Sequence, residues 1–340
     1  MSTCATAASR KNLVLFIDGT WNRPAGRAWG SDTNVRRLFS ACPDNASQKR
    51  LYLKGVGTRP LSMVDRALGG AFGRGASSRI KDCYRFLTGN YQRGDWIFVF
   101  GFSRGAFAAR SLANFLERVG LLLANHIDRV DEAYELYEGP DAKREASLAE
   151  MLQEISGSSA PQAERTDLPI HFIGVWDTVG ALGLRWCERT FPARYTEYHR
   201  TELPSNVWKA RHALAVHELR ETFAPLLWTV PASSSPERLK QLWFAGAHAD
   251  VGGGYRASET HWSDQALRWM KEEAQDAGLV VTGDFPKTAG DDESSLHHEI
   301  KGLFRFVPPT VRKALCERQP GAAKTFDMRQ SACGWRIANS

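Results

Sequence analysis

The sequence has no apolar run long enough to cross a membrane. No stretch approaches the roughly 18 consecutive apolar residues of a membrane span. The N-terminus also lacks a separate hydrophobic region followed by a small-residue cleavage site. These absences predict a cytoplasmic protein without a transmembrane segment or signal peptide, unless a signal-independent secretion system exports it.

Cysteine is scarce and shows no metal-binding or disulfide pattern. The six cysteines in 340 residues are scattered, and no two form a C-x-x-C pair. This usage is typical of free thiols in a reducing compartment. No His-x-x-x-His or carboxylate cluster with metal-ligand spacing stands out, so the sequence predicts neither a metal nor another cofactor.

Positive charge is in slight excess but is not concentrated. The net charge is +6, and no run contains five basic residues, so nucleic acid is not an expected partner. Weak attraction to an anionic lipid surface, and hence peripheral membrane contact, is compatible with this charge. The Gly-rich stretch 69–75 is not followed by Gly-Lys-Ser/Thr, which excludes a P-loop. Oligomeric state is not indicated.

What the sequence does contain is a buried-strand pattern that leads into a serine turn. Residues 96–100 (WIFVF) are an apolar, β-preferring run, and residues 106–112 are mostly good helix formers. Between them, 101–105 reads G-F-S-R-G and matches G-x-S-x-G. Strand, sharp turn and helix are the context in which this motif exposes a nucleophilic serine, here Ser103.

The residues around Ser103 suit acyl transfer. Gly101 and Gly105 remove the Cβ atoms that would block so tight a turn. The backbone N–H of Arg104 at the helix start faces the same space as the Ser103 hydroxyl, and it supplies half of a predicted oxyanion hole.

Composition and pattern predict one α/β domain with a mostly parallel sheet, helices on both faces and inserted lid segments. With 43% hydrophobic and 24% charged residues, the chain is long enough for a large core. We expect a disordered tail over 1–10, the domain over 11–286 with insertions at about 121–168 and 181–208, and a C-terminal extension over 287–340. Strands are predicted at 12–17, 51–56, 96–100, 170–176, 226–230 and 241–247, helices at 33–40, 78–90, 106–120, 133–155 and 207–219, and a flexible connector at 69–75.

Three predicted strands each end in one member of a catalytic triad. Ser103 follows the first of these, Asp177 the second and His248 the third, which is the chain order Ser, Asp, His of α/β-hydrolases. His248 would accept the serine proton and return it to the leaving group, because the unperturbed pKa of histidine lies near neutrality. Asp177 would orient the imidazole, and Ser103 would form the acyl-enzyme.

Competing assignments exist for two members of the triad. Asp250 and Asp18 also lie in turns at strand ends and are alternative acids. His212 and His217 fall in the predicted helix 207–219, where a surface or hydrogen-bonded structural role is more usual. His171 lies inside a predicted strand and is expected to pack in the core or at an edge.

The turn after the first strand is the candidate for the second oxyanion donor. Residues 18–22 read DGTWN, and the backbone of Gly19 and Thr20 would lie beside Ser103 if the two strands are neighbours. The alternative is that this turn only shapes the pocket wall, with Trp21 contacting substrate.

An aromatic and basic stretch between residues 184 and 204 is a candidate lid or substrate rim. Aromatic rings suit a water–lipid boundary, and cations suit anionic head groups. The alternative is a solvated connector whose aromatics pack on the domain. The predicted substrate contacts are Trp21, Phe102, Trp186, Tyr195 and Tyr255.

Several motifs together resemble the uncharacterised α/β-hydrolase domain family (domain of unknown function 2235) that includes type VI secretion phospholipase effectors. The likeness spans roughly 11–278 and rests on FIDGTWN, RFLTGNY, DWIFVFGFSRGAFAAR, FIGVWDTVGALG, RHALAVHELRETFAP, LWFAGAHADVGGGY and SDQALRWM. The resemblance implies a Ser-Asp-His lipase or esterase and carries over to Ser103, Asp177 and His248. Those effectors are typically longer, with an added membrane-engaging region that is not evident in this chain.

The predicted function is that of a serine hydrolase that cleaves a carboxylic ester, and the expected ester is lipid-like. The alternatives are a thioesterase, peptidase or acyltransferase that uses the same triad. A binding protein that keeps the fold without activity is a further alternative. The expected partner is a small-molecule or lipid ester.

Overall fold

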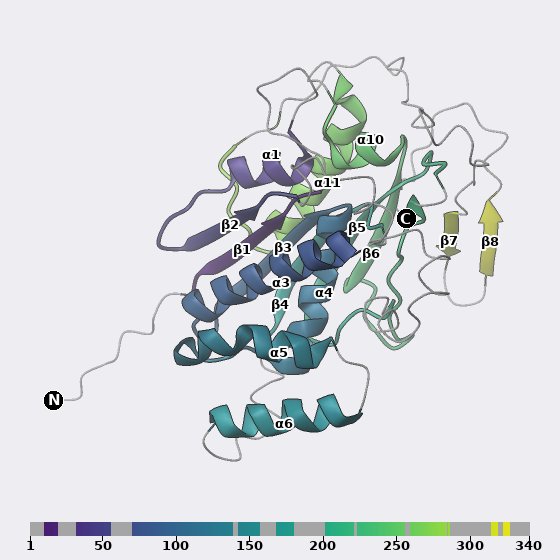
Figure 1. Cartoon of the computed structure of the whole chain (residues 1–340). Helices are drawn as coiled ribbons and strands as arrows, with labels where there is room; N and C mark the ends of the chain where they lie inside the picture. Colours follow the sequence, from purple (N-terminus) through teal and green to yellow (C-terminus); the bar gives the residue numbers. More distant parts are fainter. Residues whose placement is uncertain are drawn as a thin grey trace.

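A six-stranded, fully parallel sheet forms the centre of the molecule (Figure 1). The computed structural model describes residues 10–19, 32–55, 70–138, 142–156, 168–179, 201–220, 223–255, 259–283 and 285, with two short strands near the C-terminus. The six strands are β1 (Asn12–Ile17), β2 (Gln48–Leu53), β3 (Trp96–Phe102), β4 (Ile170–Trp176), β5 (Val207–Ala215) and β6 (Leu239–Phe244).

The strand order β2-β1-β3-β4-β5-β6 sets the position of the site. The order reverses between β1 and β3, and Leu15 of β1 is paired with Val99 of β3. In open parallel sheets, ligands bind outside the carboxyl ends of the strands at this reversal. The segments that follow β1 and β3 are therefore the first place to look for a functional site.

Helices cover both faces of the sheet (Figure 1). On one face lie α3, α4 and α5, and on the other lie α1 and α11. The helices are α1 (Asn34–Ala41), α3 (Gly70–Asn90), α4 (Arg104–Val119), η1 (Ala124–Arg129), α5 (Val130–Tyr137), α6 (Ala142–Ser156), α10 (His248–Gly252) and α11 (His261–Asp276). The prediction of an α/β fold with a mostly parallel sheet and helices on both faces is confirmed.

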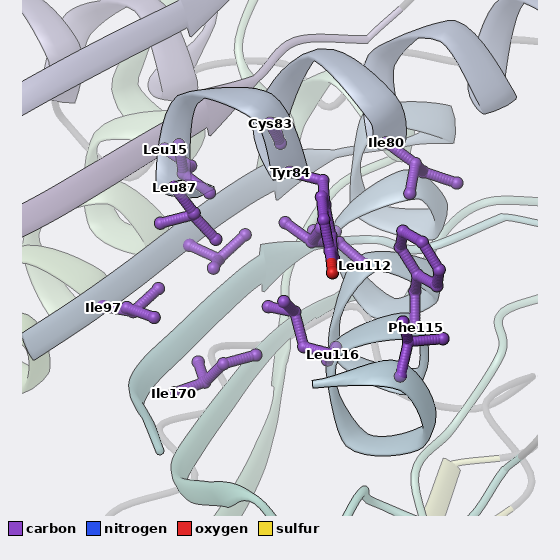
Figure 2. Close-up of a cluster of buried hydrophobic side chains, with 14 of the residues drawn as sticks. Leu15, Ile80, Cys83, Tyr84, Leu87, Ile97, Leu112, Phe115, Leu116 and Ile170 are labelled. Carbon is purple, nitrogen blue, oxygen red and sulfur yellow. The ribbon is translucent and has the colours of Figure 1, made fainter. Parts of the chain in front are cut away.

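The two faces have separate apolar cores, because successive side chains of a strand point to opposite sides. Leu13 and Leu15 of β1 pack with α3 and α4, where Tyr84 and Phe115 lie 4.6 Å apart between ring centroids (Figure 2). Phe16 of β1 packs on the opposite face with residues of α1 and α11. Since both faces are covered, β1 reads as a continuous apolar run and is buried along its whole length.

The predicted helix over 207–219 is wrong, because Val207–Ala215 forms strand β5. Residues 210–215 are all buried, since β5 lies between β4 and β6 and packs against α10 and α11. A strand buried on both faces loses the alternation that distinguishes it from a helix. Its Ala, Arg, Lys and Leu content favours helix locally, and tertiary packing overrides that preference.

Other elements also differ from the sequence prediction. The strand predicted over 51–56 is β2, Gln48–Leu53, and the single helix predicted over 133–155 is two helices, α5 and α6. The predicted strand 226–230 is represented by isolated bridges at Pro225 and Thr229. The connector 69–75 is helical from Gly70, the first residue of α3. The strand predicted over 241–247 ends at Phe244 and gives way to a turn through Gly246, whose φ is 106°.

Near the C-terminus, β7 (Ala314–Arg318) and β8 (Ala322–Phe326) pair as an antiparallel ribbon. The predicted domain boundaries and the tail over 1–10 stay predictions. Within the described part of the chain, no helix combines the length and apolarity needed to span a bilayer.

Candidate active site

Ser103 lies in a strained turn between β3 and α4. Its φ of 58° and ψ of −121° fall in a region that non-glycine residues rarely adopt, at a cost of about 1–3 kcal/mol. The Ser103 N–H donates to the carbonyl oxygen of Trp176 (3.0 Å), and the Ser103 carbonyl accepts from the Phe107 N–H (3.2 Å). These bonds hold the backbone of the turn, and α4 begins at the next residue, Arg104.

The two glycines of the motif are required by close backbone approach. A Cβ on Gly101 would lie 2.6 Å from the carbonyl oxygen of Gly105. A Cβ on Gly105 would overlap the Ile17 carbonyl oxygen and lie 2.6 Å from the Asp18 carbonyl oxygen. The first turn of α4 therefore packs directly on the end of β1, which brings the β1 end beside Ser103.

Ser103, His248 and Asp177 form a line of two hydrogen bonds. His248 Nε2 lies 2.8 Å from Ser103 Oγ, and His248 Nδ1 lies 2.6 Å from Asp177 Oδ2. The second oxygen of Asp177 accepts from the Ala215 N–H at 3.0 Å. Asp177 is fully buried, whereas Ser103 and His248 are 6% and 7% exposed. The three residues predicted to act together are in contact.

Aromatic rings enclose the imidazole of His248. The Phe102 ring lies 4.7 Å from it between centroids, and the Phe223 ring meets it edge-on at 4.9 Å. Phe102 is itself packed against Gly252, where a Cβ would overlap its ring. Phe102, predicted to contact substrate, is 3% exposed and packs beside the histidine.

A buried ion pair supports the histidine from the end of β5. Glu218 is fully buried, accepts from the His248 backbone N–H (3.3 Å) and binds the Arg220 guanidinium through both oxygens (2.6 and 2.8 Å). Burial alone would raise the pKa of Glu218, but Arg220 outweighs it and holds that pKa below its usual value. The Arg220 guanidinium lies 3.7 Å above the Phe223 ring. Sequence reasoning missed Glu218, because a helix was predicted there.

The two alternative acids, Asp250 and Asp18, form hydrogen bonds outside the line that joins Ser103, His248 and Asp177. The Asp250 carboxylate accepts from the Ala247 N–H (2.9 Å) and caps α10, the short helix that carries His248. Asp18 binds Gly19, Thr33 and Tyr52 instead of a histidine.

The other candidate histidines make structural hydrogen bonds. His212 Nε2 accepts from the Thr178 N–H at 3.2 Å, and His217 Nδ1 accepts from the Gly246 N–H at 2.9 Å. His171 is buried in β4, as predicted, with its Nε2 2.9 Å from the Ala277 carbonyl oxygen.

The predicted oxyanion and substrate residues are only partly described. The Gly19 backbone lies beside Ser103, since a Cβ on Gly19 would be 3.3 Å from Ser103 Cβ. The Gly19 N–H, however, donates to Asp18 Oδ1 at 2.7 Å. Tyr255 is half-buried, just beyond α10. Thr20, Trp21, Trp186 and Tyr195 lie outside the described residues.

A cationic residue directly follows Ser103 in the chain. Arg104 is the first residue of α4, and burial lowers the pKa of its guanidinium to about 10. Among the described residues, no group of three or more His, Cys, Asp or Glu side chains is arranged to hold a metal ion.

Distant relatives share parts of this chain. The uncharacterized protein YEL023C of Saccharomyces cerevisiae is 28% identical over 238 residues, which are 66% of this chain and 33% of the yeast protein. An uncharacterized Pseudomonas aeruginosa protein has 19% identity and a TM-score of 0.46, over 81% of this chain and 47% of that one. The Tle1 effector bound to the VgrG spike of the type 6 secretion system has 17% identity and a TM-score of 0.44, over 86% of this chain and 77% of that one.

The present chain thus spans about a third of the yeast relative and about half of the Pseudomonas protein. With TM-scores below 0.5, the structural likenesses are too distant to bear on function.

A family model gives a more direct match. Residues 11–273, most of the chain, match the model described as "T6SS, Phospholipase effector Tle1-like, catalytic domain". The family expected from the sequence motifs is confirmed. The chain belongs to the family of Tle1-like type VI secretion phospholipase effectors, and its matched region is their catalytic domain.

Proposed function

We propose that this protein hydrolyses a carboxylic ester of a lipid through an acyl-enzyme on Ser103. The observation that carries the proposal is the line of hydrogen bonds from Ser103 Oγ through His248 to the buried Asp177 carboxylate. Nucleophile, base and orienting acid within hydrogen-bond reach are the arrangement that activates a serine.

The geometry supports one sequence of steps. Ser103 Oγ attacks the ester carbonyl carbon while His248 Nε2 takes the hydroxyl proton. Asp177 stabilises the resulting imidazolium through Nδ1. His248 then returns the proton to the leaving alcohol, which departs and leaves the acyl-serine. Water then attacks the acyl-serine while His248 takes one of its protons; the bond to Ser103 Oγ breaks, the acid is released, and His248 returns the proton to Ser103 Oγ.

The proposed oxyanion donors are the N–H groups of Arg104 and Thr20. The first N–H groups of a helix have no intrahelical acceptor, and the strained φ at Ser103 turns the start of α4 toward the reacting carbonyl. Gly19, the other predicted donor, is already bonded to Asp18. Losing one oxyanion donor typically lowers kcat roughly 100- to 1000-fold.

Phospholipid is the proposed substrate because the family is one of phospholipase effectors. Export through a type VI system is proposed on the same ground. Trp186 and Tyr195 are the proposed interfacial contacts, since aromatic rings favour the water–lipid boundary.

The test combines labelling with a substrate panel. An active-site fluorophosphonate should label Ser103 and no other serine, as mapped by mass spectrometry, and Ser103→Ala should give the blank rate. Long-chain phospholipid vesicles should be cleaved faster than short soluble esters. The double variant Trp186→Ala, Tyr195→Ala should lose vesicle hydrolysis only. A label on another residue would refute the nucleophile, and preference for short esters would refute the lipid substrate.

A further inference from the structure

Asp18 is a buried carboxylate beside the nucleophile that the proposed mechanism does not use. It follows directly on β1, is 4% exposed, and lies at the carboxyl edge of the sheet where the strand order reverses. A buried carboxylate costs free energy unless it is paired or fully hydrogen-bonded. Its presence at this edge therefore calls for a reason.

Neutral donors surround the Asp18 carboxylate. Oδ1 accepts from the Gly19 N–H (2.7 Å), and Oδ2 accepts from Thr33 Oγ1 (2.9 Å) and from the Tyr52 hydroxyl (2.5 Å). No Lys or Arg of the described chain forms an ion pair with it. Burial raises the pKa of Asp18, and its hydrogen bonds only partly offset this.

One side of this network leads to Ser103. Gly19, held by Oδ1, has its Cα so close to the turn that a Cβ there would lie 3.3 Å from Ser103 Cβ. The Asp18 carbonyl oxygen contacts the first turn of α4 at Gly105. The position of the Gly19 backbone therefore sets the wall next to the nucleophile.

The other side leads to the helix that carries His248. The Thr33 backbone forms an isolated β-bridge with Gly253, the residue after α10. The side chain of the following residue, Asn34, donates to the Val251 carbonyl oxygen at 2.9 Å. Thr33 thus links the Asp18 carboxylate to the His248 segment: its hydroxyl binds Asp18, and its backbone pairs with Gly253.

We infer that Asp18 is a positioning residue that fixes the Ser103 turn and the His248 helix relative to each other. The inference rests on the proposed function of Ser103. Asp18 does not act as the acid of the triad, because His248 Nδ1 is bound to Asp177. It acts through hydrogen bonds, to Gly19 on one side and to Thr33 on the other.

The chain offers a matched control at the opposite end of the sheet. Asp95 is also 4% exposed, and its carboxylate accepts from the Lys11 N–H (3.0 Å), Lys11 Nζ (2.6 Å) and the Gln92 N–H (2.9 Å). It precedes β3, far from Ser103 along that strand. Asp95→Ala removes as many hydrogen bonds from an equally buried carboxylate without touching the site.

The readout is the rate at which a fluorophosphonate labels Ser103, together with kcat and KM on a cleaved ester and the melting temperature. Asp18→Ala should lower the labelling rate and kcat about 100-fold, the effect of misplacing reacting groups by about 1 Å, with KM nearly unchanged. Asp95→Ala should lower the melting temperature while leaving labelling and kcat at the wild-type value. Asp18→Asn should stay within about tenfold of wild type, because the Thr33 and Tyr52 hydroxyls can reverse and accept from the amide.

Each result decides the inference. A wild-type rate of Ser103 labelling in a folded Asp18→Ala variant would overturn the inference. An Asp18→Asn variant as inactive as Asp18→Ala would also overturn it, because that result would show that the charge of Asp18 is needed. If Asp18→Ala does not fold, Tyr52→Phe and Thr33→Val must each slow labelling several-fold, and a wild-type rate in either variant would overturn the inference. Failure of wild-type Ser103 to label would instead refute the proposed function.

Discussion

The structure allows a quantitative prediction for Asp177→Asn. One carboxylate oxygen of Asp177 accepts from the Ala215 N–H at 3.0 Å, and the other lies 2.6 Å from His248 Nδ1. In the asparagine variant, the Ala215 N–H must again meet an oxygen, so the amide NH₂ is directed at Nδ1. Nδ1 must then accept, and the imidazole carries its proton on Nε2. That tautomer donates to Ser103 Oγ and cannot take its proton.

The wrong tautomer should lower kcat by about four orders of magnitude, as in serine hydrolases with this triad. A factor of 10⁴ corresponds to about 5.4 kcal/mol of lost transition-state stabilisation. The measurement is kcat on a short chromogenic ester, with folding checked by circular dichroism. The control is Asp250→Asn, because Asp250 caps α10 through the Ala247 N–H, and an asparagine oxygen can do the same.

We expect the control to lose less than tenfold. If Asp250→Asn and Asp177→Asn lose activity equally while both stay folded, or if Asp177→Asn keeps a tenth of wild-type activity, the assignment of Asp177 is refuted.

Two further predictions concern stability. Gly105→Ala should lower the free energy of unfolding by roughly 1–3 kcal/mol or more, because the new Cβ would overlap the backbone at the end of β1. Gly89→Ala is the control and should be neutral or stabilising, because a Cβ there meets no atom within 4 Å. Equal melting temperatures for the two variants would contradict this. Glu218→Gln should cost about 3 kcal/mol at pH 7 because it leaves Arg220 buried without its anion. The pKa of Glu218 in the folded protein lies below the ordinary glutamate value of 4.5, so this loss should shrink as the pH falls from 4.5 through the folded pKa. An equal loss at pH 7 and pH 3 would refute the assigned ion pair.

Much of the site follows from local sequence, because each part of it ends a strand. The G-x-S-x-G turn predicted Ser103, and the glycines have the close approaches expected of them. The polar residues after β4 and β6 predicted Asp177 and His248, which lie within hydrogen-bond distance of each other. These predictions used the rule that parallel strands present their carboxyl ends at one edge, together with the serine motif and the chain order Ser, Asp, His.

What could not be predicted depends on pairing between distant segments. β5 was predicted as a helix, because a strand buried on both faces has no alternation, and the error hid Glu218 at its carboxyl end. The role of Asp18 was equally inaccessible, since it depends on Thr33 and Tyr52, which lie 15 and 34 residues further along the chain. The number of residues between two such groups does not reveal how far apart they lie in the folded protein.

The position of β5 explains why the histidine needs so much support. Asp177 follows β4 and His248 follows β6, with β5 lying between those strands. The histidine segment must therefore reach across the end of β5, and residues just beyond that strand hold it there. His217 binds the Gly246 backbone, and Glu218 accepts the His248 N–H. The proposed triad comes from strands that are not all adjacent, so its geometry depends on the end of the intervening strand as well as on its own members. Glu218, which accepts the His248 N–H, therefore belongs to the same arrangement as Asp177, which binds the His248 ring.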